Sequence, residues 1–233
     1  MILTATLNPA LDVTYEVAAL RPYATHRVAA VRRRGGGKGV NVARVLAALG
    51  ADVHATGLLG GTTGDRVRAD LDRHAVPHGF VPVSGETRQT LAIVADGDAT
   101  LFNEPGPQIS AREWREFLRR FTELAATARV IVLSGSLPPG VPEDAYATLA
   151  TAARRAHAAG AAPWVLLDTD GPALRAGLAG RPDLVKPNAA ELATALSAAP
   201  PGDGGPPALD PHAAAGELRT RGAGAVVVSL GPD

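Results

Sequence analysis

Short apolar runs alternate with helix-like segments along most of the chain, and this alternation limits the possible folds more than any other feature. The runs have the length of strands and occur at Ile2–Leu7, Val53–Leu59, Val130–Leu133, Trp164–Leu167 and Ala225–Leu230. Helical spacing of apolar residues occurs at Gly39–Leu49, Thr63–His74, Ser110–Ala128, Pro142–Ala159, Asn188–Ser197 and Pro211–Arg221. Continuous apolar runs are typical of strands covered on both faces. The sequence therefore predicts one α/β sandwich, with a mainly parallel sheet and right-handed crossovers.

Two stretches, 11–34 and 80–103, do not follow this alternation. Neither has a good helical pattern, and both contain short alternating segments such as Thr87–Val94. We expect them to supply the strands of a small second sheet, which would form a lid over the carboxyl edge of the main sheet. The Pro- and Gly-rich segment 200–207 is expected to be a surface loop.

Composition and charge exclude several classes of protein. The 233 residues contain 23 basic and 23 acidic side chains, so there is no net charge to attract nucleic acid or an anionic membrane. The absence of cysteine excludes a disulfide framework and a thiolate nucleophile. No apolar run approaches the length of a membrane span or a secretion signal. We therefore expect a soluble, cytoplasmic, single-domain protein with no nucleic-acid or membrane partner.

A glycine run at Gly35–Arg44 leads into a predicted helix. Free N–H groups at a helix N-terminus, glycines that permit close approach and one lysine, Lys38, suit a phosphate or sugar oxygens. The segment is not a Walker A loop, because Gly39 stands where Ser or Thr should follow the lysine. A flexible start to a helix remains the alternative. Lys38 and Lys186 are the only lysines among the 23 basic residues, which suggests sites that need a compact ammonium.

Polar groups also follow the predicted strands. Asp12, after the first strand, could accept hydrogen bonds from a polyol, although its segment is equally an ordinary turn. The hydroxyls in Ser134–Gly140 could contact a substrate, but the glycine spacing does not match a G-x-S-x-G nucleophile elbow. Ser110 and Glu113 have the spacing of a capping box that opens a helix. Asn188 and Glu191 have the same spacing, and their side-chain oxygens also suit magnesium beside nucleotide phosphates.

Two basic or imidazole features, an arginine run and a histidine pair, are interpreted structurally. Arg32–Arg34 is expected to be the solvated edge of a lid strand rather than a nucleic-acid patch. His74 and His78 do not indicate a metal site, because Pro77 separates them and ends the helix that would align them.

In combination, these motifs resemble the PfkB (ribokinase-like) carbohydrate kinases, and within them the hexose-phosphate branch of 1-phosphofructokinase and tagatose-6-phosphate kinase. The resemblance extends from Thr4 to the last residues, in order and at similar spacing. The matching segments are Thr4–Asp12, Gly36–Arg44, Gly57–Gly64, Gly85–Arg88, Asn103–Pro107, Leu133–Gly140, Leu167–Thr169, Lys186–Glu191 and Ser229–Gly231. The resemblance implies a ribokinase-like three-layer α/β/α sandwich with a β-sheet lid.

The resemblance also implies an activity and a set of roles. It implies ATP- and Mg²⁺-dependent phosphorylation of a sugar phosphate, most simply fructose 1-phosphate to fructose 1,6-bisphosphate, by a homodimer joined through the lid. Sugar hydroxyls would be held by Asp12, Gly36, Gly37 and Asn41. The phosphate already on the sugar would meet Lys38, Arg88, Asn103 and Ser136. Magnesium and ATP phosphates would be organised by Asn188 and Glu191, with Lys186 nearby, and Ser229 and Gly231 would begin the nucleotide pocket.

One motif of the family is missing. Its Gly-Ala-Gly-Asp segment, which carries the catalytic base and the anion hole, should follow Gly231, and the sequence given ends at Asp233. The 233 residues alone are therefore expected to be inactive, with Asp12 or Asp168 as the first candidates for a base if they are not. The alternatives are a non-catalytic sugar-phosphate-binding relative and a kinase for tagatose 6-phosphate or fructose 6-phosphate. A dinucleotide-binding oxidoreductase is disfavoured, because no G-x-G-x-x-G follows a strand.

Overall fold

A seven-stranded parallel sheet forms the centre of the molecule. The computed structural model describes residues 1–157, 162–196 and 210–230, so the predicted loop at 200–207 and Gly231 lie outside the described residues. The strands are β1 (Ile2–Thr6), β4 (Val53–Gly60), β5 (His78–Val83), β8 (Val130–Ser134), β9 (Trp164–Asp168), β10 (Leu184–Val185) and β11 (Ala225–Val226). They are ordered β11-β10-β9-β8-β1-β4-β5, and every registered pair is parallel.

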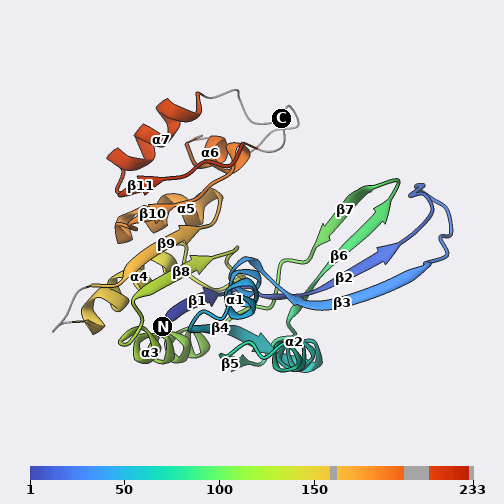
Figure 1. Ribbon diagram of the computed structural model, residues 1–233, viewed down its shortest axis with the longest axis horizontal. Helices are drawn as coiled ribbons and strands as arrows, with labels where there is room; N and C mark the ends of the chain where they lie inside the picture. The colour runs from blue at the N-terminus through green and yellow to red at the C-terminus, as the bar shows by residue number, and fades with distance from the viewer. Residues whose placement is uncertain (158–161, 197–209, 231–233) are drawn as a thin grey trace.

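Helices cover both faces of this sheet (Figure 1). They are α1 (Lys38–Ala48), α2 (Gly61–Arg73), α3 (Ala111–Ala125), α4 (Ala145–Ala156), α5 (Gly171–Gly177), the 3₁₀ turn η1 (Leu178–Gly180), α6 (Ala189–Leu196) and α7 (Pro211–Thr220). Successive strand residues belong to different cores: Leu58 packs with α3 and α4, and Leu59 packs with α1 and α2. The three-layer α/β/α sandwich with a mainly parallel sheet is thus confirmed.

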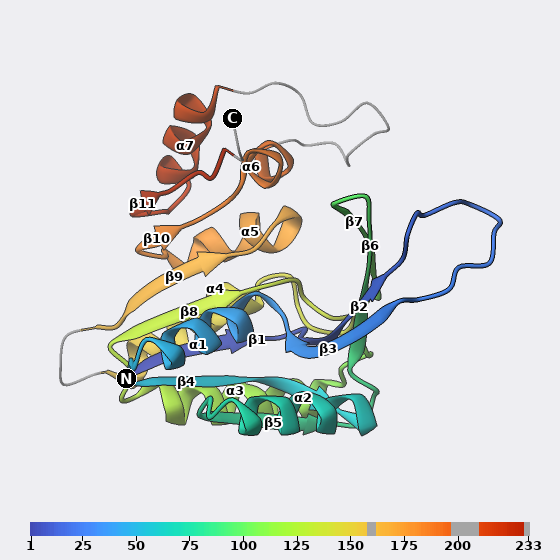
Figure 2. The same cartoon turned by 45° about the vertical axis from the view of Figure 1, so that its right-hand side comes forward.

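The second sheet projects from one edge of the sandwich as a separate blade (Figure 2). Its strands are β2 (Ala10–Glu16), β3 (Ala30–Gly36), β6 (Arg88–Ala95) and β7 (Asp98–Asn103), ordered β3-β2-β6-β7. The inner pair β2 and β6 is parallel, and each outer strand is antiparallel to its neighbour. Arg32–Arg34 therefore lies on an edge strand of the lid, as predicted.

Two predicted boundaries are wrong, and one helix was not predicted. Residues 80–83 belong to β5 at the edge of the central sheet rather than to the lid, because Val81 and Val83 are buried in the core beside β4. The strand predicted over 225–230 forms only at Ala225–Val226, and Val227 and Leu230 are exposed. Helix α5 was not predicted, because seven residues are too few to show a helical period.

The predicted start of helix α3 is confirmed. The capping box of Ser110 and Glu113 opens α3, and Phe117 and Phe121 are fully buried on its inner face. No helix within the described ranges is both long and apolar enough to cross a membrane.

Candidate active site

The glycine turn that joins β3 to α1 lies where the lid meets the sandwich. Gly37 has a φ of +110°, and a Cβ there would lie 2.9 Å from Thr6 Cγ2. At Gly36 a Cβ would lie only 1.9 Å from Asp12 Oδ2. The glycines therefore let this backbone fold tightly against the end of β1 and against the Asp12 carboxylate.

Asp12 lines a cavity of about 510 Å³ on one face of the lid. The cavity is lined by Asp12, Thr14, Arg32, Arg34, Thr90, Ala92 and Leu101. Burial raises the pKa of Asp12, and the guanidinium groups of Arg34, Arg88 and Arg44 oppose that rise. Arg34 Nη2 also donates to Asn41 Oδ1 at 3.3 Å, which connects the predicted sugar ligand on α1 to the cavity wall.

Asn8 connects two of the remaining predicted sugar-phosphate ligands, Ser136 and Arg88, to the end of β1. Its Nδ2 donates to Ser136 Oγ at 3.1 Å and to the Pro105 carbonyl at 3.0 Å. Arg88 Nε donates to the Asn8 carbonyl at 3.1 Å, and Arg88 Nη1 donates to the Glu104 carbonyl at 3.0 Å. Asn103 lies at the end of β7, in register with Thr90 of the cavity. Asn8 itself was not predicted as a site residue, although the motif that contains it was identified.

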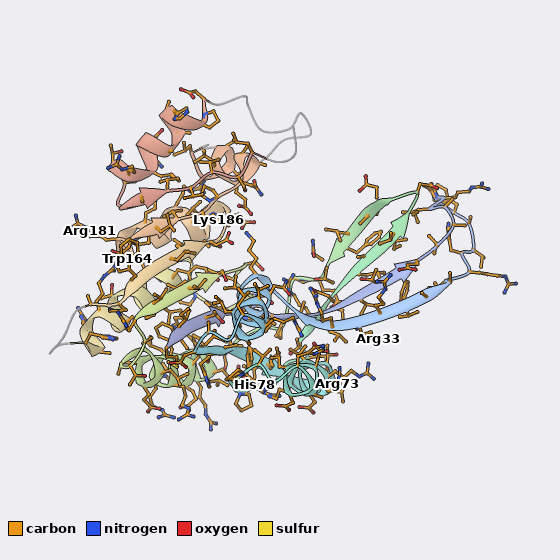
Figure 3. The ribbon with its side chains drawn as sticks, viewed as in Figure 1. Arg33, Arg73, His78, Trp164, Arg181 and Lys186 are labelled. Atoms are coloured by element: carbon orange, nitrogen blue, oxygen red, sulfur yellow. The ribbon has the colours of Figure 1, made fainter. Side chains whose placement is uncertain are left out.

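Lys38, the first residue of α1, joins two carboxylates from the opposite half of the sheet edge. Its Nζ donates to Glu191 Oε1 at 2.8 Å and to Asp168 Oδ1 at 3.0 Å. Lys186 Nζ lies 4.0 Å from the other oxygen of Asp168, and Figure 3 shows Lys186 on the sandwich side that faces the lid. Burial alone would lower the pKa of Lys38, but the hydrogen bonds to Glu191 and Asp168 outweigh it and raise the pKa.

The capping box at α6 forms as the spacing predicts. Glu191 N–H donates to Asn188 Oδ1 at 2.8 Å, and Asn188 N–H donates to Glu191 Oε2 at 2.9 Å. Ser229 N–H donates to the Pro187 carbonyl at 3.1 Å, which places Ser229 beside the same turn. One carboxylate oxygen of Glu191 therefore caps the helix, and the other accepts a hydrogen bond from Lys38.

The carboxylates of Asp168 and Glu191 offer hard oxygen donors of the kind that magnesium prefers. Both already meet one cation, the Lys38 ammonium. Within the described part of the chain no group of three or more His, Asp or Glu side chains could hold a metal by itself. Magnesium in kinases is bound by one or two carboxylates together with substrate phosphates, so this donor set is the expected kind. Asp168 belongs to a motif named in the sequence analysis but was not predicted as a site residue, because no local sequence signal indicates that it lies beside Lys38 and Glu191 in space.

A buried ion pair supports the glycine turn from the other side. Asp70 of α2 accepts from Gly35 N–H at 2.9 Å and from Arg44 Nη2 at 2.8 Å, and Arg44 Nη2 also reaches the Gly35 carbonyl at 2.8 Å. Asp70 is only 3% exposed. Burial tends to raise the pKa of Asp70, but these hydrogen bonds and charges hold it below its usual value. Sequence reasoning did not identify this clamp, because α2 and α1 meet only in the folded chain.

Comparison with known proteins finds matches over almost the whole chain. Phosphofructokinase-2 from Escherichia coli, solved with fructose-6-phosphate, is 34% identical with a TM-score of 0.85 over 99% of this chain and 74% of that one. A Thermotoga maritima protein described as a possible 1-phosphofructokinase is 29% identical, with a TM-score of 0.82 over 99% and 72%. A carbohydrate kinase from Agrobacterium tumefaciens shares the fold at 21% identity, with a TM-score of 0.71 over 99% and 70%. Residues 5–233 match the pfkB family carbohydrate kinase domain, and this chain therefore belongs to the pfkB family of carbohydrate kinases.

Proposed function

We propose that this kinase transfers the γ-phosphoryl group of ATP to a hydroxyl of a phosphorylated ketohexose, with fructose 1-phosphate as its substrate. The observation that carries the proposal is the arrangement around Lys38. This ammonium lies between the glycine turn beside Asp12 and the acidic pair Asp168 and Glu191. A sugar phosphate bound on one side of it would be adjacent to nucleotide phosphates on the other.

The sugar side would combine a carboxylate with several cations. Asp12 would accept hydrogen bonds from sugar hydroxyls, and Asn41 would orient them from α1. Arg88 and Lys38 would neutralise the phosphate on the sugar, since charge-assisted hydrogen bonds are the strong ones. Ser136, which accepts a hydrogen bond from Asn8, and Asn103, at the end of β7 opposite Thr90, would complete the contacts.

The nucleotide side would use the turn before α6. Asp168 and Glu191 would hold magnesium, which neutralises the charge on the ATP phosphates when it is bound. Lys186, Asn188 and Ser229 surround the same turn and would contact the nucleotide. In the transfer, the sugar hydroxyl oxygen forms a bond to the γ-phosphorus, the bond to ADP breaks, and the hydroxyl proton passes to a base. Positioning and charge neutralisation supply most of the catalysis in such reactions.

Fructose 6-phosphate is the second candidate substrate, because the Escherichia coli relative at 34% identity was solved with it. A panel of fructose 1-phosphate, fructose 6-phosphate and tagatose 6-phosphate, assayed for ADP release and calorimetric binding, separates these candidates. The proposal fails if none of the three sugars binds or is phosphorylated. Binding without phosphorylation by a polypeptide of residues 1–233 is expected, because its sequence contains no Gly-Ala-Gly-Asp segment to supply the base.

Lys38→Ala tests the assignment of the two sides. We expect sugar-phosphate affinity to fall by about ten- to a hundredfold, since a hydrogen bond to a charged group is worth about 1.5–3 kcal/mol, while nucleotide affinity without metal changes little. Glu191→Gln is the matched variant: Gln still serves in the capping box, so the melting temperature should hold while magnesium-dependent nucleotide affinity falls. Equal losses of both ligands in both variants would contradict the two-sided site.

A further inference from the structure

The only two lysines of the chain both lie beside the carboxylate of Asp168. Lys38 bonds to both Asp168 and Glu191, and Lys186 lies 4.0 Å from Asp168. The other 21 basic residues are all arginine. Arginine presents a rigid fork that holds a carboxylate in one geometry, whereas lysine is a compact charge on a flexible stem. Lysine, the residue type at both of these positions, is therefore better suited than arginine to exchange one hydrogen-bond partner for another.

In the absence of ligands, the formal charges of the cluster formed by Lys38, Lys186, Asp168 and Glu191 sum to zero. Each of the carboxylates on Asp168 and Glu191 carries one negative charge, and Lys38 and Lys186 carry one positive charge each. A divalent cation that binds alone would have to compete with the Lys38 ammonium for the same carboxylate oxygens and would be repelled by its positive charge. A sugar phosphate alone would bring about two more negative charges beside two carboxylates. The two ligands restore neutrality only when both are present.

The stem of Lys38 is free to make the exchange. Its backbone is fixed at the first position of α1, behind a glycine with no room for a side chain. Its side chain is 39% exposed, so the ammonium is not locked in by packing. The ammonium has three N–H donors, which can be redirected from the carboxylates to a phosphate.

We propose that Lys38 exchanges its carboxylate partners for the phosphate of the sugar, and thereby makes sugar-phosphate binding and divalent-cation binding cooperative. The proposal rests on the proposed function, because it takes the sugar phosphate and the metal as the two ligands. In the free protein the ammonium occupies the cation position between Asp168 and Glu191. A sugar phosphate draws it away and exposes both carboxylates to the metal. Linkage requires the reverse effect to be equally large.

The test measures Mn²⁺ binding, without nucleotide and without turnover. Free Mn²⁺ is followed by electron paramagnetic resonance, with and without saturating fructose 1-phosphate, and again with fructose 6-phosphate and unphosphorylated fructose. We expect the phosphorylated sugar that binds to tighten Mn²⁺ binding at least about fivefold, within the usual range of site coupling. Unphosphorylated fructose should have no effect, because it carries no anion to attract the ammonium.

Two variants separate partner exchange from general electrostatics. Lys38→Met should bind Mn²⁺ without sugar as tightly as the wild-type protein does with it, and sugar phosphate should add nothing. Lys186→Met removes a positive charge from the same carboxylate but should keep the sugar-dependent gain. The proposal is overturned if wild-type Mn²⁺ binding is undetectable or insensitive to a sugar phosphate that calorimetry shows to be bound, or if both variants behave alike. If no sugar phosphate binds, the proposed function itself has failed.

Discussion

At the scale of single residues, the absence of a side chain at Gly36 leaves room for the carboxylate of Asp12. A Cβ at this position would overlap the end of the Asp12 side chain, which is short and can rotate away. Gly36→Ala is therefore expected to leave stability nearly unchanged and to reduce sugar-phosphate affinity about as much as Asp12→Ala does, roughly ten- to a hundredfold. Calorimetry on both variants and on the double variant checks this: the losses should not add, because both act on one carboxylate. Full additivity would separate Gly36 from Asp12.

At the scale of elements, Glu113 joins β5 to α3. Its carboxylate accepts from the N–H and hydroxyl groups of both Ser84 and Ser110. The Ser110 hydrogen bond is the largest cause that lowers the pKa of Glu113, to about 2. A depressed folded-state pKa stabilises the protein above the unfolded value of 4.5, and this stabilisation is lost as pH falls from 4.5 toward 2.

Glu113→Ala should therefore cost about 1–2 kcal/mol at pH 7 and less at pH 3.5. Urea unfolding of both proteins at the two pH values measures the difference. Glu116→Ala, on the exposed side of the same helix, is the control and should cost much less. A pH-independent difference for Glu113→Ala would mean that its charge does not contribute.

At the scale of the whole molecule, the lid has an open face. The cavity beside Asp12 is lined by lid residues alone, and Leu101 on that face is 59% exposed. The opposite face is partly covered, because Leu11 and Val13 are buried against α2. We propose that a second copy of the chain covers this open face. Such a contact would form the homodimer, joined through the lid, that the family resemblance implies.

Leu101→Glu tests this arrangement by sedimentation or light scattering. It should shift the protein from dimer to monomer, because a buried unpaired carboxylate opposes association. Phe102→Glu, on the other face of the same strand and 53% exposed, is the matched control and should remain dimeric. A monomeric wild-type protein, or equal dissociation by both variants, would contradict a contact through the cavity face.

Elements with strong local signals could be predicted from the sequence. The capping boxes at Ser110 and Asn188 formed as their spacing indicated, because their partners are three residues apart. The runs that became β8 and β9 are continuously apolar, and those that became β1 and β4 are mostly apolar, because both faces of the sheet are covered. Where local signals were weak, prediction failed: β5 was given to the lid, and its true place depends on pairing with β4.

The chemistry of the site was also partly determined by the sequence. Residue type and local spacing were enough to predict anion and polyol binding at Lys38, the glycine turn and Asp12, and that binding stays a prediction. The tertiary structure decided which groups meet: Lys38 bonds to Asp168 and Glu191, which lie 130 and 153 residues further along the chain. Parallel crossovers bring the carboxyl ends of distant strands to one edge of the sheet. No local pattern encodes that meeting, because it depends on the order of strands in the sheet rather than on their neighbours in sequence.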